Sequence, residues 1–321
     1  MIGAMPDLGP AVDTVVDRCL AIKPEEETLV IADQGTRSIG EALRDAAVGA
    51  GSDAVLTIME PREIDGNEPP RTVADALAAC DVFIAPTTKS LSHTLARKRA
   101  SESGARGATM PGVTEDMLAR VMAVDFDTMA ARSNAVADLL TQALEARVSC
   151  PRGTDFALDL TERRGTADDG RLTAPGAFGN LPCGEGFVAP LSGDGRIVVA
   201  ATLASFGVAQ ELVTLTVERG RLVLADGGVG PDFIQLLKDA GDQGTNLAEL
   251  GVGTNDRARL TGNVLEDEKI LGTIHVAFGA SAGIGGTVSV PIHLDVVVLE
   301  PTLDVDGTRV LDQGRYVLDA Q

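Results

Sequence analysis

The first 148 residues alternate short apolar runs with longer segments of helical periodicity. Runs of strand length, rich in β-branched residues, stand at 28–33 (TLVIAD), 54–59 (AVLTIM) and 81–86 (DVFIAP), and a further short strand is expected at 105–110. The helices expected around them cover residues 5–21, 39–49, 71–79, 91–103, 115–122 and 128–147. Because strands that alternate with helices form parallel sheets covered on both faces, residues 1–148 are predicted to be a doubly wound, mostly parallel α/β domain.

From residue 149 to residue 321 the pattern is that of a β-rich domain with few helices. Apolar and polar residues alternate over Phe156–Thr161, as expected of a half-buried strand. Hairpin turns are predicted at Arg219-Gly220, Asp306-Gly307 and Gln313-Gly314. Further strands are expected at 197–204, 212–218 and 221–225, and a helix at 232–240. The pattern therefore predicts a second, α+β domain.

Composition narrows the classes of function. A net charge of −20 and a pI near 4.5 argue against nucleic acid as a partner, since nucleic acid requires a basic surface. No apolar run reaches the length of a membrane span, and the N-terminus lacks the basic and apolar regions of a signal peptide. The four cysteines are widely spaced without CxxC, which favours reduced thiols over a disulfide framework or a zinc knot. We therefore expect a cytoplasmic protein with no membrane or nucleic-acid partner.

One loop of the first domain is unusual. The loops contain neither G-x-G-x-x-G nor G-x-x-x-x-G-K-[ST], so a nucleotide cofactor has no support. Residues 87–94 (TTKSLSHT), however, follow the third strand at its carboxyl end, where open α/β sheets bind ligands. Thr88 or Ser90 is suited to capping the next helix. His93 is one of only three histidines in the chain, and a role in a site is as reasonable as a place on the surface.

The other two histidines stand in apolar, strand-like segments of the second domain, among carboxylates. His293 and Asp295 are two residues apart, so on a strand their side chains point to the same face. His275 would supply a second imidazole and Glu249 a further carboxylate. Buried carboxylates are costly unless a cation neutralises them, and imidazole with carboxylate is a common ligand set for divalent metals. Each residue alone is better explained as an ordinary core or surface residue, but the set together favours a metal site.

Glu185 stands in a predicted loop rich in Gly and Pro, residues 177–190 (AFGNLPCGEGFVAP). A carboxylate on a rigid loop suits a catalytic base or a metal ligand. The alternative is an ordinary surface glutamate in a turn.

Five segments together resemble the M29 metallo-aminopeptidases, the family of aminopeptidase T. The resemblance covers most of residues 80–300. The segments are AEL (248–250), ARLTGNVLEDEK (258–269), GTIHVAFG (272–279), IHLD (292–295) and the loop NLPCGEGFVAP, which is similar to the family's N-x-P-x-x-E-x-F-x-x-P. The resemblance implies a metal-dependent aminopeptidase that removes N-terminal residues from short peptides with a metal-activated water.

Carried over position by position, the resemblance also implies the residues of the site. The implied ligands of two divalent ions (Zn, Co, Mn or Mg) are Glu185, Glu249, Glu268, His275, His293 and Asp295. A carboxylate would take the proton of the attacking water, and Glu185 or Glu268 is the expected base. Members of the family are usually dimers, so a homodimer is expected.

The chain departs from the family at one position. The family carries a tyrosine shortly after the histidine that corresponds to His275, whereas this chain has ASAG at residues 280–283, and its only tyrosine is Tyr316. The departure puts peptide hydrolysis in question. Our hypothesis is that His93 supplies the missing proton donor.

A related branch, the 2,5-dihydroxypyridine dioxygenases, implies an alternative. These ring-cleaving enzymes hold one Fe(II) with two histidines and one aspartate, with histidine at the position of Glu249 and no counterpart of Glu185. Because both carboxylates are present here, a pair of divalent ions is our first interpretation and a mononuclear iron dioxygenase the second. A catalytically inactive binding protein on the same scaffold is the third.

Overall fold

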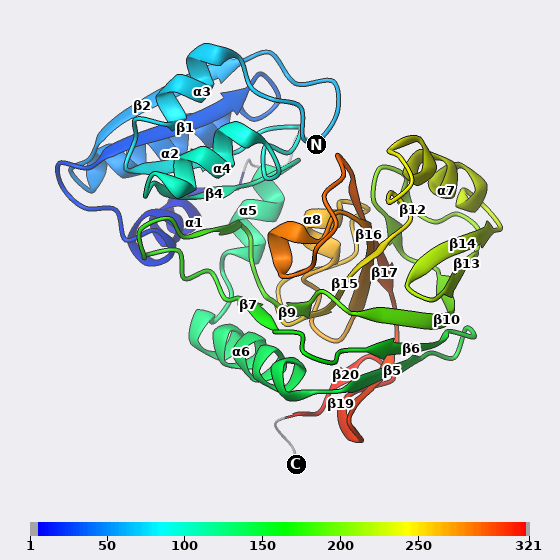
Figure 1. Ribbon diagram of the computed structural model, residues 1–321. Coiled ribbons are helices and arrows are strands. Elements are labelled where there is room, and N and C mark those ends of the chain that lie inside the picture. The colour runs from blue at the N-terminus through cyan, green and yellow to red at the C-terminus, as the bar shows by residue number, and fades with distance from the viewer. Residues whose placement is uncertain (1–5, 319–321) are drawn as a thin grey trace, which may run out of the picture. The chain divides into compact units, whose positions relative to one another are not determined.

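The computed structural model describes residues 6–318 (Figure 1). By its internal contacts the chain forms two compact units. Unit 1 comprises Met1–Val124 and Gly170–Cys183, and unit 2 comprises Asp125–Asp169 and Gly184–Gln321. None of the helices in the described part of the chain is long and apolar enough to span a membrane.

Unit 1 is built on one parallel sheet of five strands in the order β2-β1-β3-β4-β8. The strands are β1 (Glu27–Asp33), β2 (Asp53–Met59), β3 (Val82–Ala85), β4 (Arg106–Thr109) and β8 (Phe178–Asn180). The helices are α1 (Gly9–Asp13), the π-helix η1 (Thr14–Cys19), α2 (Arg37–Gly49), α3 (Arg71–Leu77), α4 (Leu95–Glu102) and α5 (Glu115–Val121). Helices α2 and α3 lie on opposite faces of the sheet (Figure 1), which confirms the predicted doubly wound architecture.

Two helices of this unit begin four residues later than predicted. The helix expected at 5–21 begins as α1 and continues as η1, while Met5 lies outside the described residues. Helix α4 begins at Leu95 rather than 91, because the hydroxyl of Thr94 accepts a hydrogen bond from the Arg97 N–H at 3.2 Å. The capping hydroxyl is therefore that of Thr94, not that of Thr88 or Ser90.

Unit 2 contains two antiparallel sheets, which confirms the predicted β-rich class. The eight-stranded sheet has the order β14-β13-β10-β6-β5-β18-β19-β20 and the seven-stranded sheet the order β12-β11-β17-β16-β15-β9-β7. The first contains β5 (Glu145–Ser149), β6 (Asp155–Asp159), β10 (Ser192–Val199), β13 (Val213–Glu218), β14 (Arg221–Asp226), β18 (Thr302–Val305), β19 (Thr308–Asp312) and β20 (Arg315–Tyr316). The second contains β7 (Thr166–Asp168), β9 (Glu185–Val188), β11 (Thr202–Leu203), β12 (Gly207–Val208), β15 (Leu247–Gly253), β16 (Ile274–Gly279) and β17 (His293–Val298). The helices are α6 (Phe126–Gln142), α7 (Gly230–Asp239), α8 (Val264–Asp267) and the 3₁₀ turn η2 (Ala282–Ile284).

Two predicted elements of this unit are wrong in part. The helix expected at 128–147 ends at Gln142, and residues 145–149 form β5. Their sequence, EARVS, contains good helix formers, but the strand buries alternate residues against the core, so tertiary packing overrides local propensity. The segment expected to be a loop at 177–190 contains β8 and β9, and Glu185 is the first residue of a strand.

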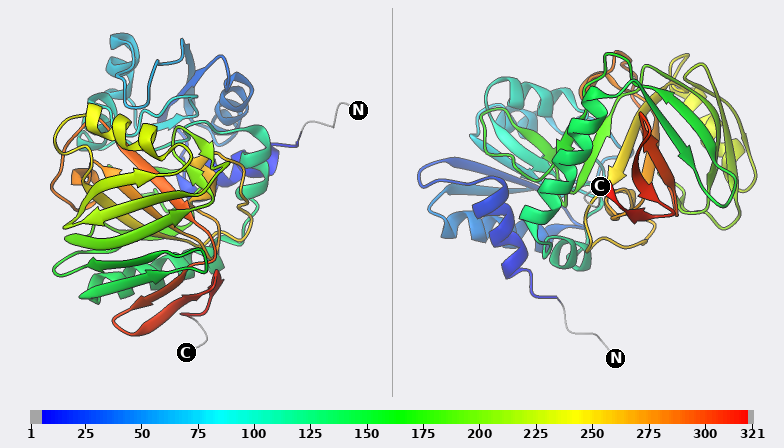
Figure 2. Two further views of the ribbon diagram at one scale, coloured as in Figure 1. Left: turned by 90° about the vertical axis from the view of Figure 1, so that its right-hand side faces the viewer. Right: turned by 90° about the horizontal axis from the view of Figure 1, so that it is seen from below.

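Strand alternation separates a core face from a second face in the seven-stranded sheet. On β16 the side chains of Ile274, Val276 and Phe278 belong to the large hydrophobic core that the two sheets of unit 2 share. The residues between them, beginning with His275, point to the opposite face because successive side chains of a strand alternate. Helix α6 packs against β7, β9 and β15 of this sheet (Figure 2, green helix). The sheet thus carries its polar residues on the face turned away from the shared core.

Candidate metal centre

The six predicted metal ligands come together in unit 2, on and beside the seven-stranded sheet. Four consecutive strands of the sheet, β17, β16, β15 and β9, each carry at least one of them. The ligands are His293 and Asp295 on β17, His275 on β16, Glu249 on β15, Glu185 on β9, and Glu268 directly after α8. The antiparallel register brings positions that are far apart in sequence to one face of the sheet.

A small residue stands on a neighbouring strand opposite each of the five ligands that lie on strands. The opposed pairs are Gly251 with His275, Gly253 with Glu185, Gly279 with His293, and Ala277 with both Glu249 and Asp295. A Cβ atom at Gly251 would lie 2.1 Å from His275 Nε2, so glycine at this position leaves the room that the imidazole occupies.

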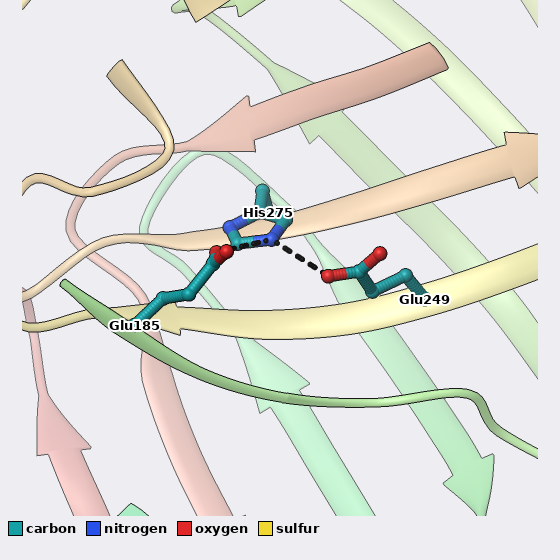
Figure 3. A group of neighbouring side chains, drawn as sticks. All are labelled: Glu185, Glu249 and His275. Atoms are coloured by element: carbon teal, nitrogen blue, oxygen red, sulfur yellow. Dashed lines mark hydrogen bonds and ion pairs between the residues drawn. The ribbon is translucent and has the colours of Figure 1, made fainter. Parts of the chain in front are cut away.

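The first ligand group consists of Glu185, Glu249 and His275 (Figure 3). His275 Nε2 lies 3.1 Å from Glu185 Oε2 and 3.4 Å from Glu249 Oε1. All three side chains are buried. One imidazole nitrogen therefore faces an oxygen of each of two carboxylates, away from solvent.

The second ligand group consists of Glu249, His293 and Asp295. His293 Nε2 lies 3.3 Å from Glu249 Oε2 and 3.6 Å from Asp295 Oδ1. The other ring nitrogen, Nδ1, donates to the backbone oxygen of Ala280 at 2.7 Å, and this contact keeps Nε2 directed at the carboxylates. Glu249 thus turns one oxygen to each group.

A third group contains Glu268 with His275 and Asp295. Beside it lies Lys269, which the sequence reasoning missed. Its ammonium is 2.7 Å from Glu268 Oε1, and its side chain is 1% exposed. The available signal was its position directly after three acidic residues and four residues before Thr273, where the apolar segment of His275 begins.

The same ammonium connects two further carboxylates. Lys269 Nζ lies 2.6 Å from Glu185 Oε1 and 3.8 Å from Oδ2 of Asp168, on β7. Asp168 was also missed, because nothing in its local sequence distinguishes it from the polar turn residues around it.

Two glycines hold Glu185 in place. Gly184 adopts a φ of 128°, a conformation that L side chains rarely take, and a Cβ there would lie 2.8 Å from Asn255 Cβ. A Cβ at Gly186 would lie 2.7 Å from the backbone oxygen of Ser133 on α6. The close approach of strand and helix makes the backbone at Glu185 rigid. The sequence predicted this rigidity for a loop, and in the structure a strand provides it.

Burial and the neighbouring charges raise the pKa of some acidic residues of the site and lower that of others. Burial raises the pKa of Glu268 to about 8 and that of Asp168 to about 7, in spite of the nearby ammonium of Lys269. Burial also opposes ionisation of Glu185, but Lys269 and His275 outweigh it and lower its pKa to about 2. Without metal, Glu268 therefore holds a proton at neutral pH, whereas Glu185 is ionised.

The two imidazoles behave as bases held among carboxylates. Burial disfavours their charged form, but the carboxylates facing them raise the pKa of His275 and His293 well above the usual value. In the metal-free site, bound protons thus supply positive charge that divalent cations would supply once a metal binds, and metal binding would release these protons.

The residues fit a divalent metal. Glu185 Oε2 is buried and accepts no hydrogen bond although it lies beside an imidazole, and His275 Nδ1 is also buried without a hydrogen bond. Carboxylate oxygen with imidazole nitrogen is a donor set for borderline ions such as Zn, Mn, Co and Fe(II). An ion would satisfy the carboxylate oxygen that the protein leaves unsatisfied.

His93, the remaining predicted site residue, lies in unit 1. It is exposed, directly before Thr94 at the start of α4. None of the ligand groups found in residues 6–318 includes it. Its role as a proton donor stays a prediction.

Comparisons with known proteins agree with the architecture of both units. The family model described as NicX, 2,5-dihydroxypyridine 5,6-dioxygenase, matches residues 12–318. No curated protein matches the chain. The solved structure of 2,5-dihydroxypyridine dioxygenase from Pseudomonas putida KT2440 is similar with a TM-score of 0.83 and 20% identity, over 97% of this chain and 96% of that one. Wild-type AmpT from Thermus thermophilus is similar with a TM-score of 0.71 and 20% identity, over 97% of this chain and 98% of that one.

Proposed function

The chain belongs to the 2,5-dihydroxypyridine 5,6-dioxygenase (NicX) family and shares its fold with AmpT, an M29 aminopeptidase, and from this premise we propose that it is a metal-dependent aminopeptidase acting on short peptides. Both neighbours are metalloenzymes, and the acidic and histidine groups of this chain are able to hold divalent ions. The step from metalloenzyme to peptide hydrolysis is the proposal, and it rests on the following features of the site.

The observation that carries the proposal is the double orientation of Glu249. Its Oε1 lies 3.4 Å from His275 and its Oε2 3.3 Å from His293, so one carboxylate is shared by two ligand groups. A shared carboxylate is the arrangement that two neighbouring ions require, and two-ion sites are typical of hydrolases such as aminopeptidases.

The charge of the site also supports two ions. Five acidic residues surround it, and one ammonium, that of Lys269, lies among them. They are Asp168, Glu185, Glu249, Glu268 and Asp295. With neutral imidazoles, the ionised set carries four uncompensated negative charges, which two divalent cations would balance and one would not.

The chain's own residues have distinct parts in such a reaction. Ions held by the two groups would polarise a peptide carbonyl and activate a water. Glu268 is the better candidate for proton transfer, because its raised pKa, about 8, lies near neutral pH, and its Oε1 accepts a hydrogen bond from Lys269. Glu185 is a ligand rather than a base, because its low pKa and its contacts with Lys269 and His275 keep it ionised.

A mononuclear iron dioxygenase is the second candidate, and the family model favours it. The match covers residues 12–318, and the dioxygenase structure has the higher TM-score of the two neighbours described above. Such an enzyme requires two histidines and one carboxylate around a single ion. Within residues 6–318, however, no ligand group contains both His275 and His293. The two-ion arrangement therefore accounts better for the placement of the imidazoles.

Metal content and substrate assays distinguish the candidates. Purified protein is analysed for bound metal, stripped, and reloaded separately with Co²⁺, Zn²⁺, Mn²⁺ or anaerobic Fe²⁺. Two ions per chain and hydrolysis of aminoacyl-p-nitroanilides, lost in Glu249→Gln, support the aminopeptidase. One Fe²⁺ per chain with oxygen uptake on 2,5-dihydroxypyridine and no peptide hydrolysis refutes it. A folded chain that binds no ion would indicate an inactive binding protein.

A further inference from the structure

Lys269 is a buried lysine whose charge is enclosed by carboxylates from three parts of unit 2. Its Nζ lies 2.6 Å from Glu185 Oε1 on β9, 2.7 Å from Glu268 Oε1 after α8, and 3.8 Å from Asp168 Oδ2 on β7. Its side chain is 1% exposed. Lysine is almost never fully buried unless it is paired, because an unpaired ammonium loses its hydration without compensation. The carboxylates therefore explain how this charge is tolerated.

The backbone fixes where the ammonium stands. The N–H of Lys269 donates to the backbone oxygen of Glu266 at 3.0 Å, and its carbonyl accepts from the N–H of Asn255 at 2.9 Å. Both Glu266 and Asn255 are buried. The side chain thus extends from a turn held on both sides.

The ammonium determines how the carboxylates can act. Glu185 gives Oε1 to Lys269 and turns Oε2 toward His275 Nε2, at 3.1 Å. Only Oε2 is then available to an ion, so Glu185 is restricted to binding through one oxygen. Glu268 likewise gives Oε1 to Lys269.

We propose that Lys269 is a positioning residue that acts as a tethered cation. Its ammonium occupies a third cation position, which is formed by Asp168, Glu185 and Glu268. Divalent ions are thereby confined to the two groups that share Glu249. Carboxylate oxygens gathered around one point are the ligands that hard cations such as Ca²⁺ prefer. A charge attached to the chain fills this position without dissociating, whatever the metal concentration.

The inference rests on the proposed two-ion centre only for where the divalent ions are confined. That Lys269 occupies a cation position is independent of the reaction. The two claims can therefore fail separately.

The test is a calcium titration of metal-free protein by isothermal calorimetry. Lys269→Met removes the charge and keeps a side chain of similar length, whereas Lys269→Arg keeps the charge. We expect Lys269→Met to bind one more Ca²⁺ per chain than the wild type, or the same number with at least tenfold higher affinity, and Lys269→Arg to match the wild type. Adding Asp168→Asn to Lys269→Met should remove the gain.

Equal calcium stoichiometry and affinity in the wild type and folded Lys269→Met would overturn the proposal. If Lys269→Met is unfolded without metal, the same titration is followed by circular dichroism. Recovery of the folded signal with Ca²⁺ supports the tethered cation, and no recovery with any divalent ion overturns it. A wild type that binds no Zn²⁺, Co²⁺ or Mn²⁺ would refute the proposed function, while the calcium gained by Lys269→Met would still be measured.

Discussion

Gly251 offers a way to disturb a ligand without changing it. An alanine Cβ at this position would stand 2.1 Å from both Nε2 and Cε1 of His275. Since ordinary contacts begin at 3.4 Å, the imidazole must retreat by about 1.3 Å. Ligand atoms hold an ion only within about 0.2 Å of their proper distances. We therefore expect Gly251→Ala to disable the group of Glu185, Glu249 and His275.

The size of the effect follows from this displacement. Losing a contact that merely orients a ligand costs about 10–100-fold in metal affinity, and moving the ligand atom itself is the larger disturbance. Affinity at this group should fall at least about 100-fold, or about 2.8 kcal/mol. The group that contains His293 stays intact, so Gly251→Ala should bind one ion where the wild type binds two. Overpacking should also lower folding stability by about 1–3 kcal/mol.

Calorimetric titration of metal-free protein with Zn²⁺ or Co²⁺ measures the number of ions, and thermal unfolding shows that the variant is folded. Gly193→Ala is the matched control. This buried glycine lies in the eight-stranded sheet, and its Cβ would meet Leu247 Cδ2 at 2.8 Å, Phe156 Cζ at 3.0 Å and the backbone oxygen of Ala157 at 3.1 Å, so the substitution overpacks the core and none of these neighbours is a ligand. It should lose stability and keep both ions. Two ions of unchanged affinity in Gly251→Ala would refute the role of His275.

Three further predictions concern other residues. Glu249→Gln should weaken both ions by at least about tenfold and Glu185→Gln only one, which the metal stoichiometry of dialysed protein decides. The hydrogen-bonded Arg106 lowers the pKa of Glu26 below 4.5, so this pair stabilises the fold above about pH 4.5 and the stabilisation is lost as the pH falls through the lowered pKa. Glu26→Gln should therefore cost about 1 kcal/mol in urea unfolding at pH 7 and nothing near pH 2, and equal losses at both pH values would contradict the assignment. Asp267→Ala should cost about 3 kcal/mol in metal-free protein, because the carboxylate accepts from two backbone N–H groups and a buried threonine hydroxyl, and an unchanged unfolding midpoint would show that these bonds contribute nothing.

The parallel sheet of unit 1 could be predicted because its signals are local. The run at 28–33 is apolar at its four central positions, and in the structure the strand is buried from Thr28 to Asp33. Strands buried on both faces require such runs, and helices between them require helical periodicity, so each element is visible in its own residues. The hairpins at Asp306-Gly307 and Gln313-Gly314 were visible for the same reason, since a tight turn needs residues that tolerate positive φ.

Elements stabilised by distant partners could not be predicted in this way. Strand β9 has only four residues, and it exists because β7 and β15 pair with it on either side. Strand β5 begins with three good helix formers, Glu-Ala-Arg, but it pairs with β6 and β18. In both cases the stabilising hydrogen bonds come from segments that a local pattern does not contain.

The site shows the same division. The separation of His293 and Asp295 by two residues is a local signal, and it placed both on one face of a strand. The position of Lys269 among three carboxylates depends on three separate chain segments. In the sequence alone, the residue is simply a lysine that follows acidic residues. Strand β15 carries a signal of an intermediate kind. Small residues recur at its alternate positions, and Gly251 and Gly253 stand opposite two ligands. Glycine weakens a strand interior, so its recurrence there indicates that a large group approaches the backbone closely. Here the large groups are an imidazole and a carboxylate. Alternating glycines in a buried strand therefore predict bulky side chains on the strands paired with it, and for Gly251 that side chain is His275 on β16.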